Sequence, residues 1–296
     1  MRNYSAQNFK KFIVKFFFQV IVLVGLTGCY EKQEGCLDIR ATNFDLEADI
    51  SCEDCCEYPD LKLKFLHRQV EPDTVYSIGF ADSVYYDGVS NPFRINALRY
   101  YISNIRVVDS DGSEARINET IDISKIGGSV VTFTDDFLLV NGNLSTSLTA
   151  GSFSTIKTYN KVRFFIGLDN ELEGVDPSTL PDNHVLAVNQ DSSMFDFQNG
   201  HYLMANHEIY TDTTAIDTIP RVMEILLWYG PVEMELEFPE SITLPEGFDL
   251  EITIQVDAPS WFETSDVRTI SDDQFFTNIV SKLSESFSVI DVSVDN

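Results

Sequence analysis

Hydrophobic and polar residues alternate along much of the chain, with the period of two that is typical of β-strands with one buried face. The clearest example begins at Leu61, where apolar and basic residues alternate as far as Phe65. The longest runs from Pro92 to Asp111-Gly112, a dipeptide that favours a tight hairpin turn. Similar patterns predict further strands at 76–80, 83–86, 129–134, 137–140, 161–168, 202–210, 223–229, 233–238 and 250–256.

Only one segment of the sequence has the period of a helix. Ser271 can cap an acidic first turn, and the apolar residues that share one face after it are Phe276, Ile279, Val280 and Leu283. Because regular short strands separated by turns favour two packed sheets, we predict an all-β fold over 60–296. The expected architecture is an antiparallel β-sandwich with one short C-terminal helix. We expect a hairpin turn at Asn141-Gly142, then a Ser/Thr-rich loop to Gly151, and a long acidic loop over 169–191.

The N-terminal segment, 1–28, has the features of a lipoprotein signal peptide. A basic start precedes an apolar run over 16–28 that is too short for a stable membrane anchor. The run ends in Leu26-Thr-Gly-Cys29, the form of a lipobox, so we predict a lipid on Cys29 and a polar tether over 29–34. An ordinary secretory peptide is the alternative. Lipid chains would hold the mature protein in the cell envelope, on the periplasmic or surface face of the outer membrane.

The chain is strongly acidic. Its formal net charge is −27, and removal of residues 1–28, which carry four positive charges and no negative one, takes this to −31. Such a surface repels phosphate backbones, so we expect no nucleic-acid partner. Solvation of the surface is the simplest role for this acidity.

Four cysteines follow Cys29, and all of them lie within 36–56: Cys36, Cys52, Cys55 and Cys56. An even number of cysteines in an exported segment predicts two disulfides. A bridge between the adjacent Cys55 and Cys56 would strain the peptide between them, so Cys36 and Cys52 are expected to pair with these two. Zinc binding is the competing interpretation, because Cys52-x-x-Cys55 has ligand spacing.

Residues 35–59 form a small cysteine-rich module. They resemble a short motif, Gly-Cys-x-Asp…Cys-x-Tyr, of secreted and surface proteins of Bacteroidetes. The match covers Gly35, Cys36, Asp38, Ala41, Asn43, Phe44, Ala48, Cys56 and Tyr58. So small a segment needs disulfides or a metal to be stable. Oxygen ligands for calcium could come from Asp38, Asn43, Asp45 and Asp49, although turn formation and solvation would also explain them.

The chain contains no Gly-rich phosphate loop, no nucleophile elbow and no His-Glu-x-x-His motif. Its four histidines, His67, His184, His201 and His207, are therefore the main candidates for chemistry, as metal ligands. His67 ends the first strand and His184 lies in a loop. His201 and His207 would share one face of a regular strand, since they are six residues apart. Each of them also has an ordinary structural explanation.

Over roughly residues 61 to 290 the chain resembles the MbnP-like domain. This family is named for the copper-binding partner protein of methanobactin systems, and its members include many lipoproteins of Bacteroidetes. The most specific match is the block Leu98-Arg-Tyr-Tyr-Ile-Ser-Asn-Ile105. The matching pieces are Leu63–His67, Phe93–Ile105, Gly151–Ile156, Phe164–Asp169 and Ser193–Gly200.

The resemblance implies a β-rich envelope protein and, in the characterised branch, copper held by histidines and an oxidised tryptophan. His67 and His184 lie at or near positions where the family has histidines. Two other motifs differ: the family's Met-Phe-Trp-x-Trp is Met194-Phe-Asp-Phe197 here, and its His-x-Gly is Trp228-Tyr-Gly230. Phenylalanine has no donor atom, whereas copper needs imidazole or sulfur ligands.

Two functions follow from these observations. The first is a non-catalytic, membrane-anchored envelope lipoprotein whose loops bind a protein or a small ligand. The second is a copper-binding or copper-trafficking protein that uses His67 with His184 or His201, and Met194 as a further donor. Hydrolysis by the pairs Asp135-Asp136 or Asp272-Asp273 is disfavoured, because neighbouring residues on a strand point apart. We therefore expect the protein not to be an enzyme.

Overall fold

The computed structural model describes residues 31–52, 54–153, 157–214 and 219–295. The predicted signal peptide and Cys29 lie outside these residues. The chain divides into two compact units, one of residues 1–37 and 45–56 and the other of residues 38–44 and 57–296. Within the described ranges, no helix is long and apolar enough to cross a membrane.

The first unit is held together by its cysteines. Two short strands, β1 (Glu34–Gly35) and β2 (Ile50–Ser51), pair in parallel. Disulfides join Cys36 to Cys56 and Cys52 to Cys55, which confirms one of the two expected pairings. Because all four sulfur atoms are used in these bonds, Cys52-x-x-Cys55 offers no thiolate to zinc, and the zinc alternative is wrong.

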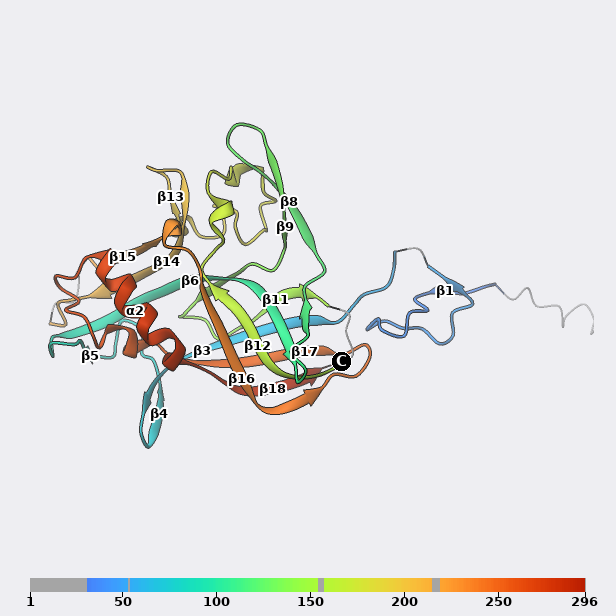
Figure 1. Cartoon of the computed structure of the whole chain (residues 1–296), viewed down its shortest axis with the longest axis horizontal. Helices are drawn as coiled ribbons and strands as arrows, with labels where there is room; N and C mark the ends of the chain where they lie inside the picture. The colour runs from blue at the N-terminus through green and yellow to red at the C-terminus, as the bar shows by residue number, and fades with distance from the viewer. Residues whose placement is uncertain (1–30, 53, 154–156, 215–218, 296) are drawn as a thin grey trace, which may run out of the picture. The chain divides into compact units, whose positions relative to one another are not determined.

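The second unit is the predicted β-sandwich (Figure 1). Its nine-stranded sheet follows the order β13-β14-β6-β12-β16, with β5, β7 and β10 paired to β6 and β15 paired to β14. Its five-stranded sheet follows the order β11-β3-β17-β18, with β4 paired to β3, and β8 and β9 form a separate hairpin. The strands are β3 (Asp60–Glu71), β4 (Thr74–Ser77), β5 (Tyr85–Tyr86), β6 (Pro92–Asp109), β7 (Glu114–Arg116), β8 (Thr120–Ser124), β9 (Val130–Thr134), β10 (Leu138–Asn141), β11 (Ser147–Ser152), β12 (Thr158–Ile166), β13 (Phe195–Asp196), β14 (His201–Tyr210), β15 (Arg221–Leu226), β16 (Val232–Thr243), β17 (Asp249–Asp257) and β18 (Phe287–Asp295).

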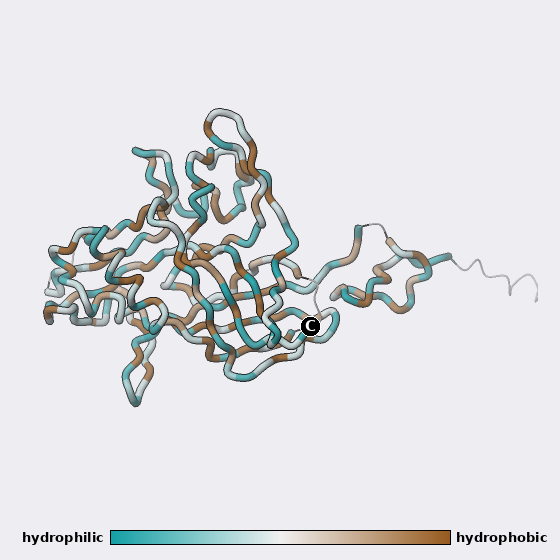
Figure 2. The backbone as a smooth tube through the Cα atoms, in the orientation of Figure 1, coloured by the Kyte–Doolittle hydropathy of each residue, from teal (hydrophilic) through white to brown (hydrophobic). Residues whose placement is uncertain are grey.

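Hydrophobic and hydrophilic residues alternate along the long strands, as Figure 2 shows. In β3 the buried positions are Leu61, Leu63, Phe65 and His67, so the alternation seen in the sequence is the buried face. Phe65 contacts the other sheet, since its ring centroid lies 6.2 Å from that of Phe164 in β12. The strand pairs of these two sheets are antiparallel except β3 with β17, which is parallel.

The middle of β6 is buried on both faces, although the sequence predicted burial on one. Tyr100 points into the sandwich, where its ring centroid lies 6.2 Å from that of Phe65. Tyr101 contacts the ring of Tyr202, whose hydroxyl donates a hydrogen bond to the carbonyl of Leu186. The loop that contains Leu186 therefore covers the second face of the larger sheet.

An extra residue interrupts β6 near its centre. The register against β12 shifts between Arg163 and Phe165, and Asn104 adopts a left-handed conformation with φ of 51°. The carboxylate of Asp136 accepts hydrogen bonds from the backbone N–H groups of Asn104 and Ile105, at 3.1 and 2.7 Å. Asp136 therefore provides partners for backbone donors that the bulge removes from the ladder.

Four parts of the chain differ from the prediction. The Ser/Thr-rich stretch forms β11 in the smaller sheet, and the C-terminal residues form β18. Asn141-Gly142 is not a hairpin turn, because β10 and β11 belong to different sheets. The acidic loop contains short 3-10 helices, η1 (Asn170–Leu172), η2 (Pro177–Thr179) and η3 (Ser192–Met194).

The predicted helix is confirmed as α2 (Asp272–Ser286). The side chain of Ser271 caps it by accepting a hydrogen bond from the backbone of Gln274. Its buried residues Phe275, Ile279 and Leu283 lie on one side of the helix. Two more 3-10 helices complete the unit, η4 (Leu227–Tyr229) and η5 (Ala258–Phe262).

Candidate functional site

His67 lies in the core of the sandwich. Its side chain follows the buried face of β3, and its Nε2 lies 3.0 Å from the hydroxyl of Tyr100. Its Nδ1 is buried and has no hydrogen-bond partner among the described residues. Burial lowers the pKa of His67 to about 4, so the ring is neutral at physiological pH.

His207, on β14, is the histidine that the structure brings close to His67. Burial, and to a smaller extent the charge that His67 would carry when protonated, lowers its pKa to about 3. Like His67, it has a buried Nδ1 without a partner among the described residues. The His207 ring lies 5.5 Å from the ring of Trp261 and 6.0 Å from that of Phe275. Two neutral imidazoles with unpaired nitrogens thus share one part of the core.

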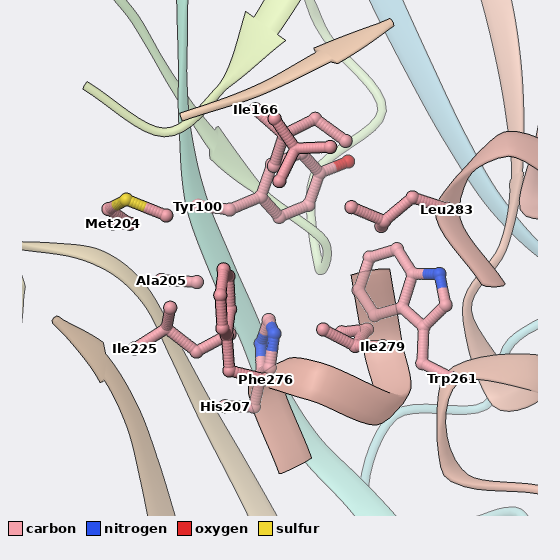
Figure 3. A pocket seen from close by; sticks show the side chains of 11 residues that line it. Tyr100, Ile166, Met204, Ala205, His207, Ile225, Trp261, Phe276, Ile279 and Leu283 are labelled. Atoms are coloured by element: carbon pink, nitrogen blue, oxygen red, sulfur yellow. The ribbon is translucent and has the colours of Figure 1, made fainter. Parts of the chain in front are cut away.

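A small cavity of about 20 Å³ lies beside His207, large enough for a single water molecule. Figure 3 shows its walls, which come from strands β6 and β14, from η5 and from helix α2. Apart from His207, the walls are almost entirely apolar. Side chains that line the cavity include Tyr100, Met204, His207, Trp261, Ile279 and Leu283.

His184 lies in a different place, on the loop over the larger sheet. Its Nδ1 accepts a hydrogen bond from the backbone of Leu186 at 3.2 Å, so the proton of the neutral ring is on Nε2. That Nε2 donates to the Oδ1 atom of Asp135 at 3.0 Å. Both nitrogens are therefore engaged, and a metal ion would have to displace one of these hydrogen bonds.

His201 and Met194 lie in surroundings that differ from those of His67, His207 and His184. The ring of His201 lies 5.2 Å from that of Trp228, and its Nε2 is 3.6 Å from a carboxylate oxygen of Asp196. Met194 is fully buried in η3. His201 and His207 do not share a face as expected for a regular strand, because β14 contains a bulge between Leu203 and Ala205 that reverses the alternation.

The residues chosen from the sequence as copper ligands therefore have separate sets of contacts. Over the described ranges, no group of three or more histidine, cysteine, aspartate or glutamate side chains is arranged to hold a metal ion. His207 was the residue missed as a partner for His67. The sequence predicted that His207 lies in a strand. It did not predict the bulge at Met204, which changes the face of the strand on which His207 lies.

The four side chains chosen as calcium ligands are divided between the two units. Asp38 and Asn43 belong to the second unit, and Asp45 and Asp49 to the first. Asp38 and Asp45 accept hydrogen bonds from Arg40 and Glu47, two residues further along the chain, whereas Asn43 and Asp49 accept from Glu57 and Gln33, 14 and 16 residues away. The hydrogen bonds of Arg40 hold the pKa of Asp38 well below its usual range. The first two are turn contacts, and each of the other two connects separate parts of one unit.

A surface groove lies near the acidic loop. It consists of two adjoining hollows with volumes of about 460 and 380 Å³, within the range of roughly 300–1,000 Å³ that small-ligand sites occupy. Both hollows are lined by Phe137, Thr149, Asn183 and Val185, which makes them one continuous groove. In Figure 1, the acidic loop lies beside the β8–β9 hairpin.

The acidic loop is held in place by its own aspartates. Asp169, Asp176 and Asp191 each cap a 3-10 helix by accepting a backbone hydrogen bond at its first turn. Asp191 also forms an ion pair with Arg99, at 2.9 Å from the guanidinium Nε. Buried apolar residues of the loop, including Leu186, then pack on the sheet. The acidity of this segment thus shapes the wall of the groove.

The groove combines an apolar floor with acidic groups at one end. Phe137 and Val185 contribute apolar surface, and Glu119 and Asp135 contribute carboxylates. No lysine or arginine is among the described residues that line it. The carboxylate of Asp135 contacts His184, whereas that of Glu119 accepts hydrogen bonds from the backbone of Ser152. The groove therefore suits a ligand with an apolar body and a cationic or hydrogen-bond-donating head.

The chain is similar to a known protein family and to a solved structure. A family model described as MbnP matches residues 59–279, about three quarters of the chain. No curated protein matches the chain. Among solved structures, MbnP from Methylosinus trichosporium is similar over 70% of this chain and 78% of its own, with 11% sequence identity and a TM-score of 0.36. The residues that the family model matches include the groove, His67 and His207.

Proposed function

Since the chain belongs to the MbnP family, we propose that it is a non-catalytic binding module of the cell envelope, tethered to the membrane through a lipid on Cys29. The observation that carries the binding function is the continuous groove, which has the size of a ligand site and whose described lining residues include carboxylates but no lysine or arginine. Its ligand is a small molecule or peptide side chain with an apolar body and a cationic head.

Lipid attachment is tested by labelling with a palmitate analogue in the native host. The label should appear on the wild-type protein and be lost in Cys29→Ser, which should also leave the membrane fraction. Label on the Cys29→Ser variant, or none on the wild type, would contradict the tether. This test is independent of the groove.

Binding in the groove is tested with phenethylammonium as the probe and phenethyl alcohol as its uncharged counterpart. Isothermal titration should detect the ammonium compound more strongly than the alcohol, because only the former is attracted by Glu119. Glu119→Gln keeps an oxygen for the backbone of Ser152 but removes the charge, and it should weaken binding severalfold. Glu171→Gln, an exposed glutamate of η1, is the control.

Equal affinity for the two compounds, or an equal effect of Glu171→Gln, would argue against this site. Absence of any heat of binding with either compound would do the same.

Copper binding is the second candidate, and it is favoured by the two buried imidazoles. His67 and His207 each have an unpaired Nδ1, and imidazole nitrogen is a suitable donor for copper. They would hold the ion in the core, and copper would supply redox or transport chemistry there. Competition with a chromophoric Cu(I) chelator in the absence of oxygen tests this. His207→Leu and His67→Leu should each abolish uptake, whereas His184→Gln should not.

A further inference from the structure

Exposed aromatic and acidic side chains gather on a second surface, at the start of β14 and the start of α2. Trp228 is 58% exposed, whereas the other tryptophan, Trp261, is buried. We call this surface the aromatic–acidic patch. Its residues are Asp196, His201, Glu224, Trp228, Tyr229, Asp272 and Asp273.

Ring contacts make the patch continuous. The Trp228 ring lies 5.2 Å from His201 and 6.2 Å from Tyr229. Tyr229 in turn stacks on Phe276 of α2 at 4.5 Å and donates a hydrogen bond to the carboxylate of Asp273. On the other side, His201 pairs across the strands with Asp196. Packing against neighbouring rings and helix α2 thus holds the side chains of this surface in place.

The charges of the patch are negative and poorly compensated. Partial burial and the nearby charges of Asp196 and Asp272 raise the pKa of Glu224, which shows that these three carboxylates are close enough to repel one another. Arg221, the cation nearest along β15, donates its hydrogen bonds to the backbone carbonyls of Val267 and Ile270. Its charge also acts on Asp272, so it compensates the carboxylates of the patch only in part.

We propose that the aromatic–acidic patch docks an arginine- or lysine-rich segment of a protein partner. An exposed tryptophan attracts cations through its ring face, and carboxylates at its edge bind guanidinium in two-pronged hydrogen bonds. Tryptophan is also among the residues that contribute most to protein interfaces. A second copy of this chain is a poor occupant, because without residues 1–28 and their four positive charges the net charge of −27 becomes −31 for each copy. Anionic lipid surfaces are repelled for the same reason.

This proposal does not depend on the groove, since the two surfaces share no residue. It is tested by isothermal titration of the mature chain with a capped tetra-arginine peptide. A capped tetra-citrulline peptide has nearly the same shape without the charge. Tetra-arginine should bind more tightly at low ionic strength than at physiological ionic strength, and tetra-citrulline should not bind.

Matched variants locate the site. Trp228→Ala and Glu224→Gln should each weaken tetra-arginine binding by about fivefold or more. Tyr86→Ala, which removes an aromatic ring that is 65% exposed elsewhere, and Glu240→Gln, an exposed glutamate of β16, should leave the affinity unchanged. Unchanged thermal unfolding of all four variants checks that the fold is intact.

The proposal is overturned if tetra-arginine does not bind, or if Trp228→Ala and Tyr86→Ala weaken binding equally. Equal affinity for tetra-citrulline would overturn it too. Tighter binding of an uncharged chito-oligosaccharide would assign the exposed rings to sugar stacking and would also reject the proposal.

Discussion

At the scale of single residues, burial decides the chemistry of the core histidines. His67 continues the alternation of Leu61, Leu63 and Phe65, so its burial could be predicted from the sequence. The burial of His207 could not, because the bulge in β14 changes which residues face inward. Neither ring has a carboxylate neighbour that would favour its protonated form, and the pKa of each is lowered.

His207→Leu should reduce the dependence of stability on pH. The pKa of His207 is about 3 and that of His67 about 4 in the folded chain, against about 6.5 when unfolded. The unfolded chain therefore binds more protons as the pH falls below 6.5, and the free energy of unfolding decreases. Each histidine should contribute a loss of about 2 kcal/mol between about pH 7.5 and about pH 5.

Urea unfolding of the wild type and of His207→Leu, at about pH 7.5 and at about pH 5, measures the difference in lost stability. Asp136 acts in the opposite direction, because burial raises its pKa to about 6 and the folded state then gains protons as the pH falls. It is present in both proteins and cancels in the comparison. An equal loss of stability in the wild type and in His207→Leu would contradict the prediction.

At the scale of elements, the strands with regular alternation were predictable and the irregular ones were not. β3 and β12 follow their predicted ranges closely. In β18 the register against β17 shifts near Ile290, which is exposed, and this interrupts the alternation that began with Phe287 and Val289. β11 is rich in Ser, Thr and Gly and forms a strand because β3 offers it an edge. Whether such a segment becomes a strand therefore depends on the strand with which it pairs rather than on the propensity of its own residues.

The bulge in β6 gives a prediction at the same scale. Asn104→Gly should leave stability within about 1 kcal/mol of the wild type, because glycine adopts a positive φ readily and only the hydrogen bond from Arg116 is lost. Asn104→Val should cost about 2 kcal/mol, since a β-branched residue is strained in this conformation. Thermal and urea unfolding measure both. A valine variant as stable as the glycine variant would show that the bulge relaxes.

At the scale of the whole molecule, the resemblance to the MbnP-like domain identified the family, and the sequence pattern identified the sandwich. Neither could place the groove, which depends on three aspartate-capped turns packing over the larger sheet. The aromatic–acidic patch was equally hidden, because Asp196, Trp228 and Asp273 come from separate segments that the fold brings together through His201 and Tyr229.

The two compact units should differ in their response to loss of a disulfide. The first unit exposes Leu46 and much of Ile50, so it has little core, and the Cys36–Cys56 bond closes a loop of 20 residues. Replacing both cysteines by serine should cost this unit about 3 kcal/mol and lead to rapid amide exchange there. The thermal midpoint of the sandwich should not change. A shift of that midpoint by several degrees would mean that the two units unfold together.

The parallel pairing of β3 with β17 has a consequence for how the protein is made. The backbone of Asp60 is hydrogen-bonded to Asp249, 189 residues later, so the first strand of the sandwich to be synthesised has one unpaired edge until almost the whole polypeptide is available. Products of interrupted synthesis that stop before β17 would keep this edge unpaired. Such fragments would be prone to aggregate, and the host would have to remove them by proteolysis.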